Sequence, residues 1–405
     1  MEVCEPSNLL KIFSSNNLQI YYFHISQKSR IFAKPMGTTE DYHPCEGQEF
    51  KDVMRNLADC DLFANLSSKI FPELTLEEAK EKILSFDNIR QFQSTAMFRG
   101  CEYIIAHSMS QFTYSGEEHL DGKPCLFISN HRDIVLDAMM LQYILIQQGH
   151  DTSHVVVGSN LWEMPLLASL ARVNKMYGID RGGTHREYYD ALMKMSHHLR
   201  HLVAERGESV WIAQRNGRTK DGLDHTDPAL IKMIAASGDR SSPVSALDTM
   251  HIVPVSVSYE WEPCGLLKAR ELCLRQQGPY TKRPGEDTQS IISGITDFKG
   301  HVHFSICKPI ELSELEATNG NFDLIAALID HRISQGYHIW PNNMIAQQML
   351  HHSPAVASSD EYLRFTRYLN QACTQVPLGD NFRNTLLGIY ANSCPEETET
   401  TLKDN

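Results

Sequence analysis

The sequence predicts an α/β fold with a mixed central β-sheet flanked by helices, and with helical extensions at both ends. Two observations lead to this prediction. In the middle of the chain, short apolar runs alternate with longer stretches in which apolar residues recur at helical spacing. Both flanking regions favour helices. We therefore expect a mainly helical N-terminal region at 1–93, an α/β domain at 94–312 and a helical C-terminal region at 313–405.

The N-terminal region contains a stretch at 74–92 with apolar residues at helical spacing and with Thr75 in the position of an N-cap. The C-terminal region repeats this spacing at 321–339 and 360–376. The last residues, 395–405, are polar and acidic and are expected to form a disordered tail. These stretches justify the two helical extensions.

Five strand-like runs define the predicted sheet. They are CLFISN at 125–130, HVVVGSN at 154–160, SVWIAQ at 209–214, HIVPVSVSY at 251–259 and HVHFSIC at 301–307. Pro254 interrupts the fourth run, and a proline cannot donate a hydrogen bond to a neighbouring strand. We therefore expect this run to be an edge strand, or an irregular strand near a cleft.

The composition is that of a globular protein. Of 405 residues, 42% are hydrophobic, which is enough for a substantial core. The formal net charge of −13 argues against a surface that coats nucleic acid. Ten cysteines are scattered without a CxxC pair, so we expect them to be reduced and the protein to be cytoplasmic. The first residues lack the pattern of a secretory signal, and no apolar run approaches the roughly 20 residues that cross a bilayer.

The first candidate site follows the run at 125–130. His131 lies at the expected carboxyl end of a strand, which is the edge where open α/β sheets bind ligands. Asp137 comes six residues later, at the start of a helical pattern, and Asp133 is a closer second acid. A single His–acid pair is often only structural, so the neighbouring turns must decide.

Two further turns are suited to anions. Arg181 and two glycines precede a helix that is expected to begin near Thr184, and such a turn can bind phosphate through backbone amides and a guanidinium. After the third strand-like run come Arg215, Arg218 and Lys220. Three cations this close repel one another unless they face a dianion. An ordinary glycine turn and an exposed basic loop are the structural alternatives.

Taken in order, NHRDIVLD, YGIDRGG, IAQRNGRTKDG and IVPVSVSY resemble the four sequence blocks of glycerolipid acyltransferases, which act on glycerol-3-phosphate or 1-acylglycerol-3-phosphate and share a PlsC-like domain. The segment HVHFSICKPIEL resembles the strand that usually follows them. The resemblance covers about 94–312 and implies an acyltransferase-like fold. It also implies transfer of a fatty acyl group in phospholipid biosynthesis.

The resemblance assigns roles to the residues of these blocks. His131 would be the general base and Asp137 the acid that orients it. The residues expected to bind the substrate are Asn130, Arg181, Arg215, Asn216, Gly217, Arg218 and Lys220. Acyl-CoA or acyl carrier protein would be the donor and a phosphorylated glycerol the acceptor, with no cofactor and no metal.

Two positions depart from the family pattern. The family has an acid five residues after the histidine, whereas here Leu136 occupies that place and the acid is Asp137 or Asp133. Asn216 stands where the family has a glutamate before glycine, and an amide carries no charge. The alternative is therefore a protein of the same fold that uses a different acceptor, or one that has lost activity and acts as a lipid-binding or scaffold protein.

Other classes are less well supported. His197 and His201 share a helix face at i, i+4 spacing, but the chain has no HExxH motif. The chain also lacks the GxSxG motif of serine hydrolases. The apolar segment at 160–173, with Trp162, is expected either to contact the cytoplasmic face of a membrane or to form a buried helix.

Overall fold

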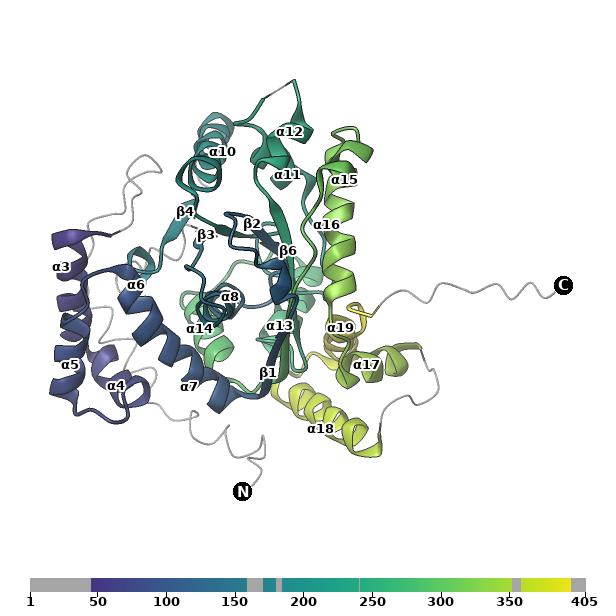
Figure 1. The fold of residues 1–405 in the computed structure, drawn as a ribbon. Helices are drawn as coiled ribbons and strands as arrows, with labels where there is room; N and C mark the ends of the chain where they lie inside the picture. The colour runs from purple at the N-terminus through teal and green to yellow at the C-terminus, as the bar shows by residue number, and fades with distance from the viewer. Residues whose placement is uncertain (1–44, 159–169, 180–183, 240, 352–357, 395–405) are drawn as a thin grey trace. The chain divides into compact units, whose positions relative to one another are not determined.

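The computed structural model describes residues 45–158, 170–179, 184–239, 241–351 and 358–394 (Figure 1). In these ranges seven strands form one mixed sheet in the order β1-β7-β6-β2-β5-β3-β4, with helices along the chain between them. This confirms the predicted α/β class with a mixed sheet and flanking helices. The expected tail at 395–405 lies outside the described residues, as does the first part of the N-terminal region.

The strands are β1 (Met109–Ser115), β2 (Leu126–Ser129), β3 (His154–Gly158), β4 (Met176–Ile179), β5 (Val210–Ala213), β6 (Ile252–Tyr259) and β7 (Gly300–Ile306). Pairing is parallel between β2 and β6, between β3 and β4, and between β3 and β5. The sheet is mixed because β7 pairs with β6 in the antiparallel direction and with β1 in parallel. All five strand-like runs of the sequence contain strands.

By compactness the described chain divides into two units, each made of two segments. The first contains the described residues up to Tyr103 and those of 145–212, and the second contains 104–144 and the described residues after 212. The domain limits at 93 and 312 stay a prediction. Both candidate turns with acids or cations at 129–137 and 213–224 belong to the second unit.

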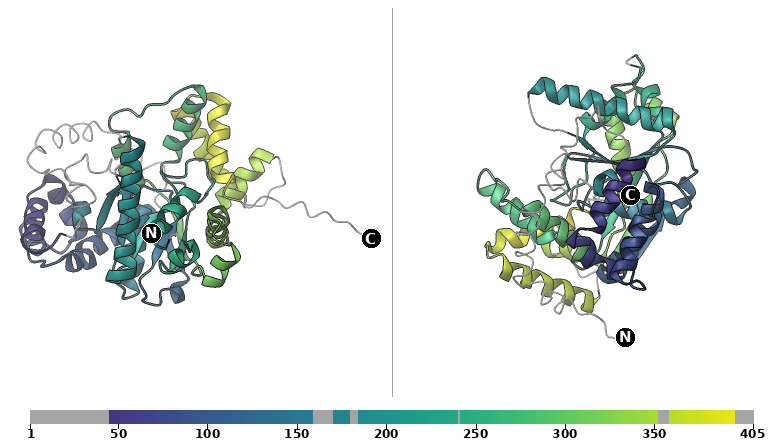
Figure 2. Two further views of the ribbon diagram at one scale, coloured as in Figure 1. Left: turned by 90° about the horizontal axis from the view of Figure 1, so that it is seen from above. Right: turned by 90° about the vertical axis from the view of Figure 1, so that its left-hand side faces the viewer.

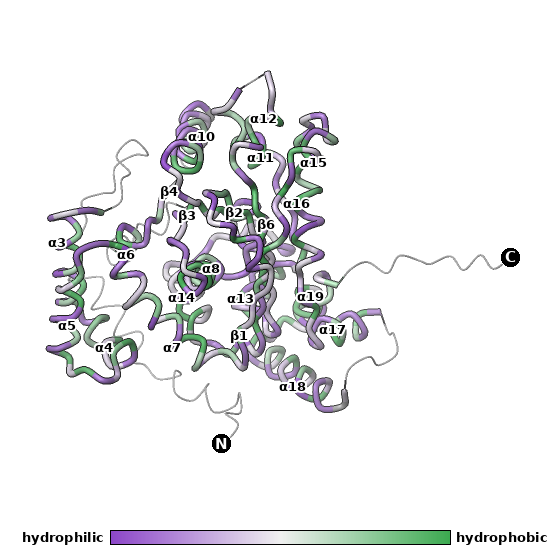
Figure 3. Tube along the Cα trace, viewed as in Figure 1, coloured by the Kyte–Doolittle hydropathy of each residue, from purple (hydrophilic) through white to green (hydrophobic). Residues whose placement is uncertain are grey.

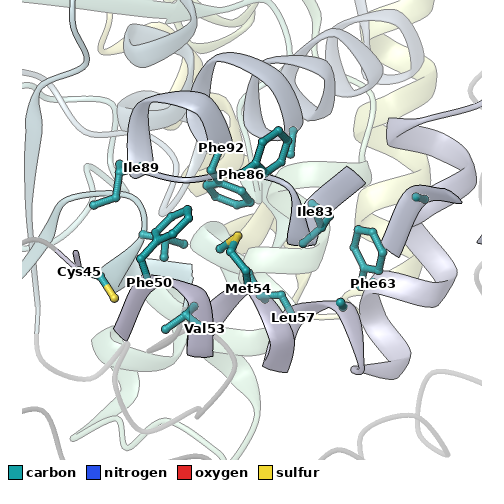
Figure 4. Packing of buried hydrophobic residues seen from close by; sticks show 14 of the residues in the cluster. Cys45, Phe50, Val53, Met54, Leu57, Phe63, Ile83, Phe86, Ile89 and Phe92 are labelled. Atoms are coloured by element: carbon teal, nitrogen blue, oxygen red, sulfur yellow. The ribbon is translucent and has the colours of Figure 1, made fainter. Parts of the chain in front are cut away.

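The first unit is rich in helices. Its helical segments are α3 (Gly47–Ala58), α4 (Asp61–Ile70), α5 (Leu76–Leu84), α6 (Ile89–Phe92), η3 (Gln93–Met97), α10 (His185–Arg200) and η6 (His201–Arg206). Hydrophilic and hydrophobic residues alternate along α3 and α5 (Figure 3), as in helices with one buried face. Those faces pack in one cluster that includes Phe50 and Met54 of α3, Ile83 of α5 and Phe92 of α6 (Figure 4).

Two predicted helix starts in this unit are confirmed. The Thr75 hydroxyl accepts the backbone N–H of Glu78, and the Glu78 side chain accepts the backbone N–H of Thr75. The same capping box joins Thr184 and Glu187 at the start of α10. Each box satisfies donors that a helix N-terminus otherwise leaves unpaired. The stretch at 74–92 forms two helices rather than one, because Asn88 caps a second start.

The second unit contains the strands β1, β7, β6 and β2. Its helical segments are η4 (Glu117–His119), α11 (Pro228–Ala235), α12 (Pro243–Asp248), α13 (Gly265–Gln277), α14 (Glu286–Thr296), α15 (Leu312–Ala317), α16 (Phe322–Gly336), α17 (Pro341–His351), α18 (Ser359–Gln375) and α19 (Gly379–Ala391). Helix α16 contacts β6, and α13, α17, α18 and α19 share one apolar cluster. The yellow helices α18 and α19 lie side by side in both views of Figure 2.

Two long helices connect the units along the chain, α7 (Phe98–Ser108) and α8 (Leu136–Gln147). Helix α8 is almost entirely apolar after its first turn, and most of its side chains are buried. It begins seven residues after the last residue of β2. The run that delivers His131 therefore leads through one turn directly into a buried helix.

The prediction of an edge position for Pro254 is wrong. Strand β6 lies between β7 and β2, and every one of its residues is buried. Pro254 is tolerated because the antiparallel register with β7 begins one residue later, at Val255. The Pro254 carbonyl still accepts the backbone N–H of Cys307, 2.9 Å away. A missing donor at the end of a ladder costs no hydrogen bond.

Strand β1 was not predicted from the sequence. Its residues, MSQFTYS, include only three large apolar side chains, and most of the strand is partly or fully exposed. It lies at the end of the sheet, where β7 is its neighbour. An edge strand needs little apolar surface, so the sequence signal is weak. No described helix is long and apolar enough to cross a membrane.

Candidate active site

The turn after β2, residues 130–137, begins with a buried asparagine. The Asn130 side chain donates to the Val257 carbonyl at 2.9 Å and accepts the Val257 N–H at 2.8 Å. Ser129 is the last residue of β2 that pairs with β6 through its backbone. The Asn130 side chain then bonds to the backbone of β6 beyond the end of this pairing. Asn130 is fully buried and also donates to Asp224. In the structure it therefore positions the turn.

His131 follows and pairs with Asp137. Its Nδ1 lies 2.9 Å from Oδ2 of Asp137, whose side chain is 0% exposed, whereas the imidazole is 15% exposed. A carboxylate can only accept a hydrogen bond, so Nδ1 carries the proton in this pair. The basic lone pair of the neutral ring is then on Nε2. The structure therefore brings His131 and Asp137 together as the sequence predicted.

Asp137 is held by three more hydrogen bonds. Its Oδ2 accepts the backbone N–H groups of Arg132 at 2.6 Å and Asp133 at 2.8 Å, and Oδ1 accepts the Tyr259 hydroxyl at 2.7 Å. Burial and the charge of Asp137 raise the pKa of Tyr259 well above its usual value, so the phenol stays a donor. The carboxylate is fixed in orientation before any substrate arrives.

Asp133 has a different task. Its Oδ1 accepts the N–H groups of Val135 at 2.9 Å and Leu136 at 2.8 Å, so it caps the start of α8. The side chain is fully buried under α14, where a Cβ on Gly294 would lie 2.1 Å from Oδ2. Burial and the neighbouring Asp137 raise the pKa of Asp133. Of the two acids that the sequence left open, Asp137 is the partner of His131.

A second turn, at 214–224, follows β5 and is bonded to the first. The Thr219 N–H donates to the His131 carbonyl at 2.7 Å, and the Thr219 hydroxyl donates to Asp224 at 2.6 Å. Gly222 has a φ of +85°, and a Cβ there would lie 2.3 Å from the Ile389 carbonyl. Only glycine fits this position. We call residues 130–137 the histidine turn and 214–224 the basic turn.

The cations of the basic turn are not equivalent. Lys220 forms an ion pair with Glu271, and burial lowers its pKa. Arg215 lies 3.7 Å from Asp221. The charge of Arg218 acts on Asp133 of the histidine turn and on Cys264, and in both cases it acts to lower the pKa. Asn216 and Gly217 are exposed at the tip.

Several buried polar atoms at these turns have no hydrogen-bond partner among the described residues. They are Nη1 of Arg218, Nε of Arg215, both amide atoms of Gln214, and Oδ2 of Asp133. Buried polar groups in proteins are almost always satisfied, and exceptions often mark places where a ligand or water belongs. The unpartnered donors of the basic turn are therefore suited to oxygen atoms of a ligand.

One residue that the sequence assigned to the site is not described by the structure, and several residues that contact the site were not predicted. Arg181 lies outside the described residues. The sequence did not indicate Tyr259 or Asp224, which hold Asp137 and Asn130, because both are far from the histidine in the chain. Arg132 was also missed. No group of three or more His, Cys, Asp or Glu side chains in the described part of the chain could hold a metal ion.

Both turns lie within a part of the chain that matches a family model. Residues 111–258 match the family model described as Acyltransferase, and this range contains both turns. The match runs from β1 to β6. This part of the chain is therefore similar to the acyltransferase family.

A solved structure was also found to be similar. It is the 1-acyl-sn-glycerophosphate (LPA) acyltransferase PlsC from Thermotoga maritima, with 11% sequence identity and a TM-score of 0.36. The similarity covers 70% of this chain and 96% of that chain. No curated protein matches the chain.

Proposed function

We propose that the protein transfers a fatty acyl group from acyl-CoA or acyl carrier protein to a hydroxyl of glycerol-3-phosphate or 1-acylglycerol-3-phosphate, with His131 as the general base. The observation that carries the proposal is the pairing of His131 Nδ1 with Asp137 at 2.9 Å, together with three further hydrogen bonds on that acid. This arrangement fixes the tautomer whose Nε2 accepts a proton.

The reaction proceeds by direct attack of the acceptor. Nε2 of His131 takes the proton of the acceptor hydroxyl while its oxygen attacks the thioester carbonyl carbon. The imidazolium that forms is stabilised by Asp137. The tetrahedral intermediate then breaks its C–S bond, and the leaving thiolate takes the proton from the imidazolium. An ester and a free thiol result, and the base is regenerated.

The basic turn would bind the acceptor phosphate. Arg218 and Arg215 have donors without partners among the described residues, and Arg218 acts electrostatically on the histidine turn. A guanidinium binds phosphate through two parallel hydrogen bonds. Lys220 contributes less, because Glu271 already neutralises it. Holding the phosphate there would orient the hydroxyl towards His131.

The test is product formation by the purified protein with each donor and each acceptor. His131→Ala is expected to reduce kcat by at least ~10³-fold, because the base is lost. His201→Ala is the matched control, since His201 also pairs its Nδ1 with an acid, Glu205, at 2.7 Å. Equal activity of wild type and His131→Ala would refute the proposal.

Asn216 supports a second possibility for the acceptor. It is exposed at the tip of the basic turn and uncharged, where the related enzymes have a glutamate. A panel of acceptors, assayed with wild type and Asn216→Glu, tests whether the natural acceptor differs from a glycerol phosphate. Activity with glycerol phosphates only in Asn216→Glu would favour the different acceptor.

We also propose a cytoplasmic protein that contacts a membrane peripherally, because a long-chain acyl group must reach the site. Most of the apolar segment at 160–173 lies outside the described residues, so the proposal rests on its sequence. Flotation with anionic liposomes tests it. A protein that stays in the soluble fraction at every lipid concentration would contradict membrane contact.

A further inference from the structure

The residue after the proposed base is a buried arginine. Arg132 is 1% exposed. Its guanidinium donates to Asp224 at 2.7 Å and to Glu262 at 3.2 Å. It also donates to the Gly222 carbonyl at 3.3 Å and to the Ser393 hydroxyl at 3.1 Å. Arginine is rarely fully buried unless its charge is paired. The burial of Arg132 and its set of partners therefore need an explanation.

The charges around Arg132 balance. Lys268, 1% exposed, pairs with Glu262 and donates to the Arg132 carbonyl at 2.6 Å. Arg132 and Lys268 thus carry two positive charges, and Asp224 and Glu262 carry two negative ones. Burial alone would raise the pKa of Asp224, but the Arg132 guanidinium and three hydrogen bonds keep it below its usual value. Removing one member leaves an unpaired buried charge.

The same contacts join the histidine turn to the basic turn. Asp224 accepts from Arg132 and Asn130 on one side and from the Thr219 hydroxyl on the other. The Gly222 carbonyl, also in the basic turn, accepts a further bond from Arg132. The Arg132–Asp224 ion pair therefore helps to fix the distance between the proposed base and the proposed phosphate site, together with the bonds from Asn130 to Asp224 and from the Thr219 N–H to the His131 carbonyl.

We propose that Arg132 is a positioning residue, which holds the base-bearing turn and the acceptor-binding turn in register. The C-terminal part of the chain supports it, because the ring of Tyr337 lies 5.3 Å from the guanidinium and Ser393 binds it. The inference rests on the proposed function. It assigns Arg132 no contact with substrate, and its effect should fall on kcat rather than on KM.

The experiment compares Arg132→Met, Arg132→Lys and the double variant Arg132→Met/Asp224→Asn. The double variant removes the ion pair without leaving an unpaired charge, and an asparagine oxygen can still accept from Thr219 or from Asn130, although not from both. Melting temperature reports stability, and steady-state kinetics report kcat and KM for the acceptor. Arg332→Met/Glu314→Gln is the control, because it removes another ion pair of the same unit.

Arg132→Met is expected to lower both melting temperature and kcat. The double variant is expected to regain most of the melting temperature, whereas its kcat stays about 100-fold below wild type, since a misplacement of about 1 Å can cost that much. The KM for the acceptor should change less than about threefold in the double variant. Arg132→Lys keeps the charge but lacks the fork, so it should regain stability more than kcat.

Recovery of kcat together with stability in the double variant would overturn the positioning role and leave only a structural one. A low kcat in the control pair would also overturn it, because any lost ion pair would then have the same effect. Failure of the proposed function looks different. In that case His131→Ala would retain activity, whatever the Arg132 variants do.

Discussion

The histidine turn and the basic turn differ in how far their polar groups are satisfied within the protein. In the histidine turn, Asp137 has four hydrogen-bond partners, and Asn130 is bonded to β6 and to Asp224. Oδ2 of Asp133 is the one buried polar side-chain atom of this turn without a partner among the described residues. In the basic turn, Arg215, Arg218 and Gln214 have buried polar atoms without a partner among the described residues. Under the proposed function, the first turn is organised for proton transfer, and the second has bonding capacity left for a ligand.

The difference suggests how the two turns divide the work of catalysis. A base must be fixed before the reaction, because reorganisation during the transition state raises the barrier. A phosphate site gains affinity from donors that bind nothing else in the free protein. Variants of the histidine turn should therefore act on kcat, and variants of the basic turn on KM for the acceptor.

The largest effect is expected from Asp137→Asn. An amide has only one acceptor oxygen, so it cannot accept from all the donors that surround Asp137. It also carries no charge to stabilise the imidazolium, so kcat should fall by about 10³-fold with KM nearly unchanged. Steady-state assays with saturating donor measure it. Glu205→Gln, which alters the acid of the exposed His201 pair, is the control. A loss of less than about tenfold would break the comparison, since the acid would then be mainly structural.

Arg218→Met should act on binding. Losing a guanidinium that holds a phosphate is expected to raise the KM for the acceptor about 50-fold, with a smaller change in kcat. Lys220→Met is the matched control, because Lys220 already pairs with Glu271 and should change KM less than about fivefold. A larger effect of Lys220→Met than of Arg218→Met would reverse the assignment of the phosphate site.

The sequence predicted the sheet and the place of His131 after a buried strand, for a physical reason. Buried strands need continuous apolar runs, so β2, β3, β5, β6 and β7 were visible, whereas the exposed edge strand β1 was not. His131 was visible because it directly follows such a run. Both features can be predicted because they depend only on residues that are neighbours in the sequence.

The partners of the site could not be predicted in the same way. Tyr259 and Asp224 contact the histidine turn from positions 122 and 94 residues away from their partners in the chain. Which of Asp133 and Asp137 faces the base depends on how the turn enters α8, since one acid caps the helix and the other lies in its first turn. Lys220 was predicted to face a ligand, but Glu271 on α13 pairs with it.

Tyr259→Phe sharpens the comparison within the histidine turn. The variant removes one hydrogen bond to Asp137 and leaves a buried oxygen unsatisfied, and such bonds to charged groups contribute about 1.5–3 kcal/mol. The acid remains bonded to His131 and to two backbone amides, so kcat is expected to fall only about tenfold. Single-turnover assays measure the chemical step directly. A fall as large as that of Asp137→Asn would mean that the backbone amides alone do not hold the acid.

The smallest effect is expected from Asp133→Asn, and it concerns stability rather than rate. Asparagine caps a helix about as well as aspartate, so the bonds to Val135 and Leu136 can be kept. Because burial and Asp137 raise the pKa of Asp133, its carboxyl favours the folded state while protonated, and this advantage is lost as the pH rises through the raised pKa. The variant carries no such charge.

At pH 7 Asp133→Asn should therefore melt about 2 °C above wild type, and the difference should vanish or reverse as the pH falls towards the usual aspartate range. Thermal unfolding followed by circular dichroism between pH 4 and 8 measures this. Asp287→Asn on α14 is the control, because it makes the same substitution at a partly exposed acid that pairs with Lys282. A variant that is less stable than wild type at pH 7 would show that the Asp133 charge is needed, through Arg218 or Lys299, to hold the two turns together.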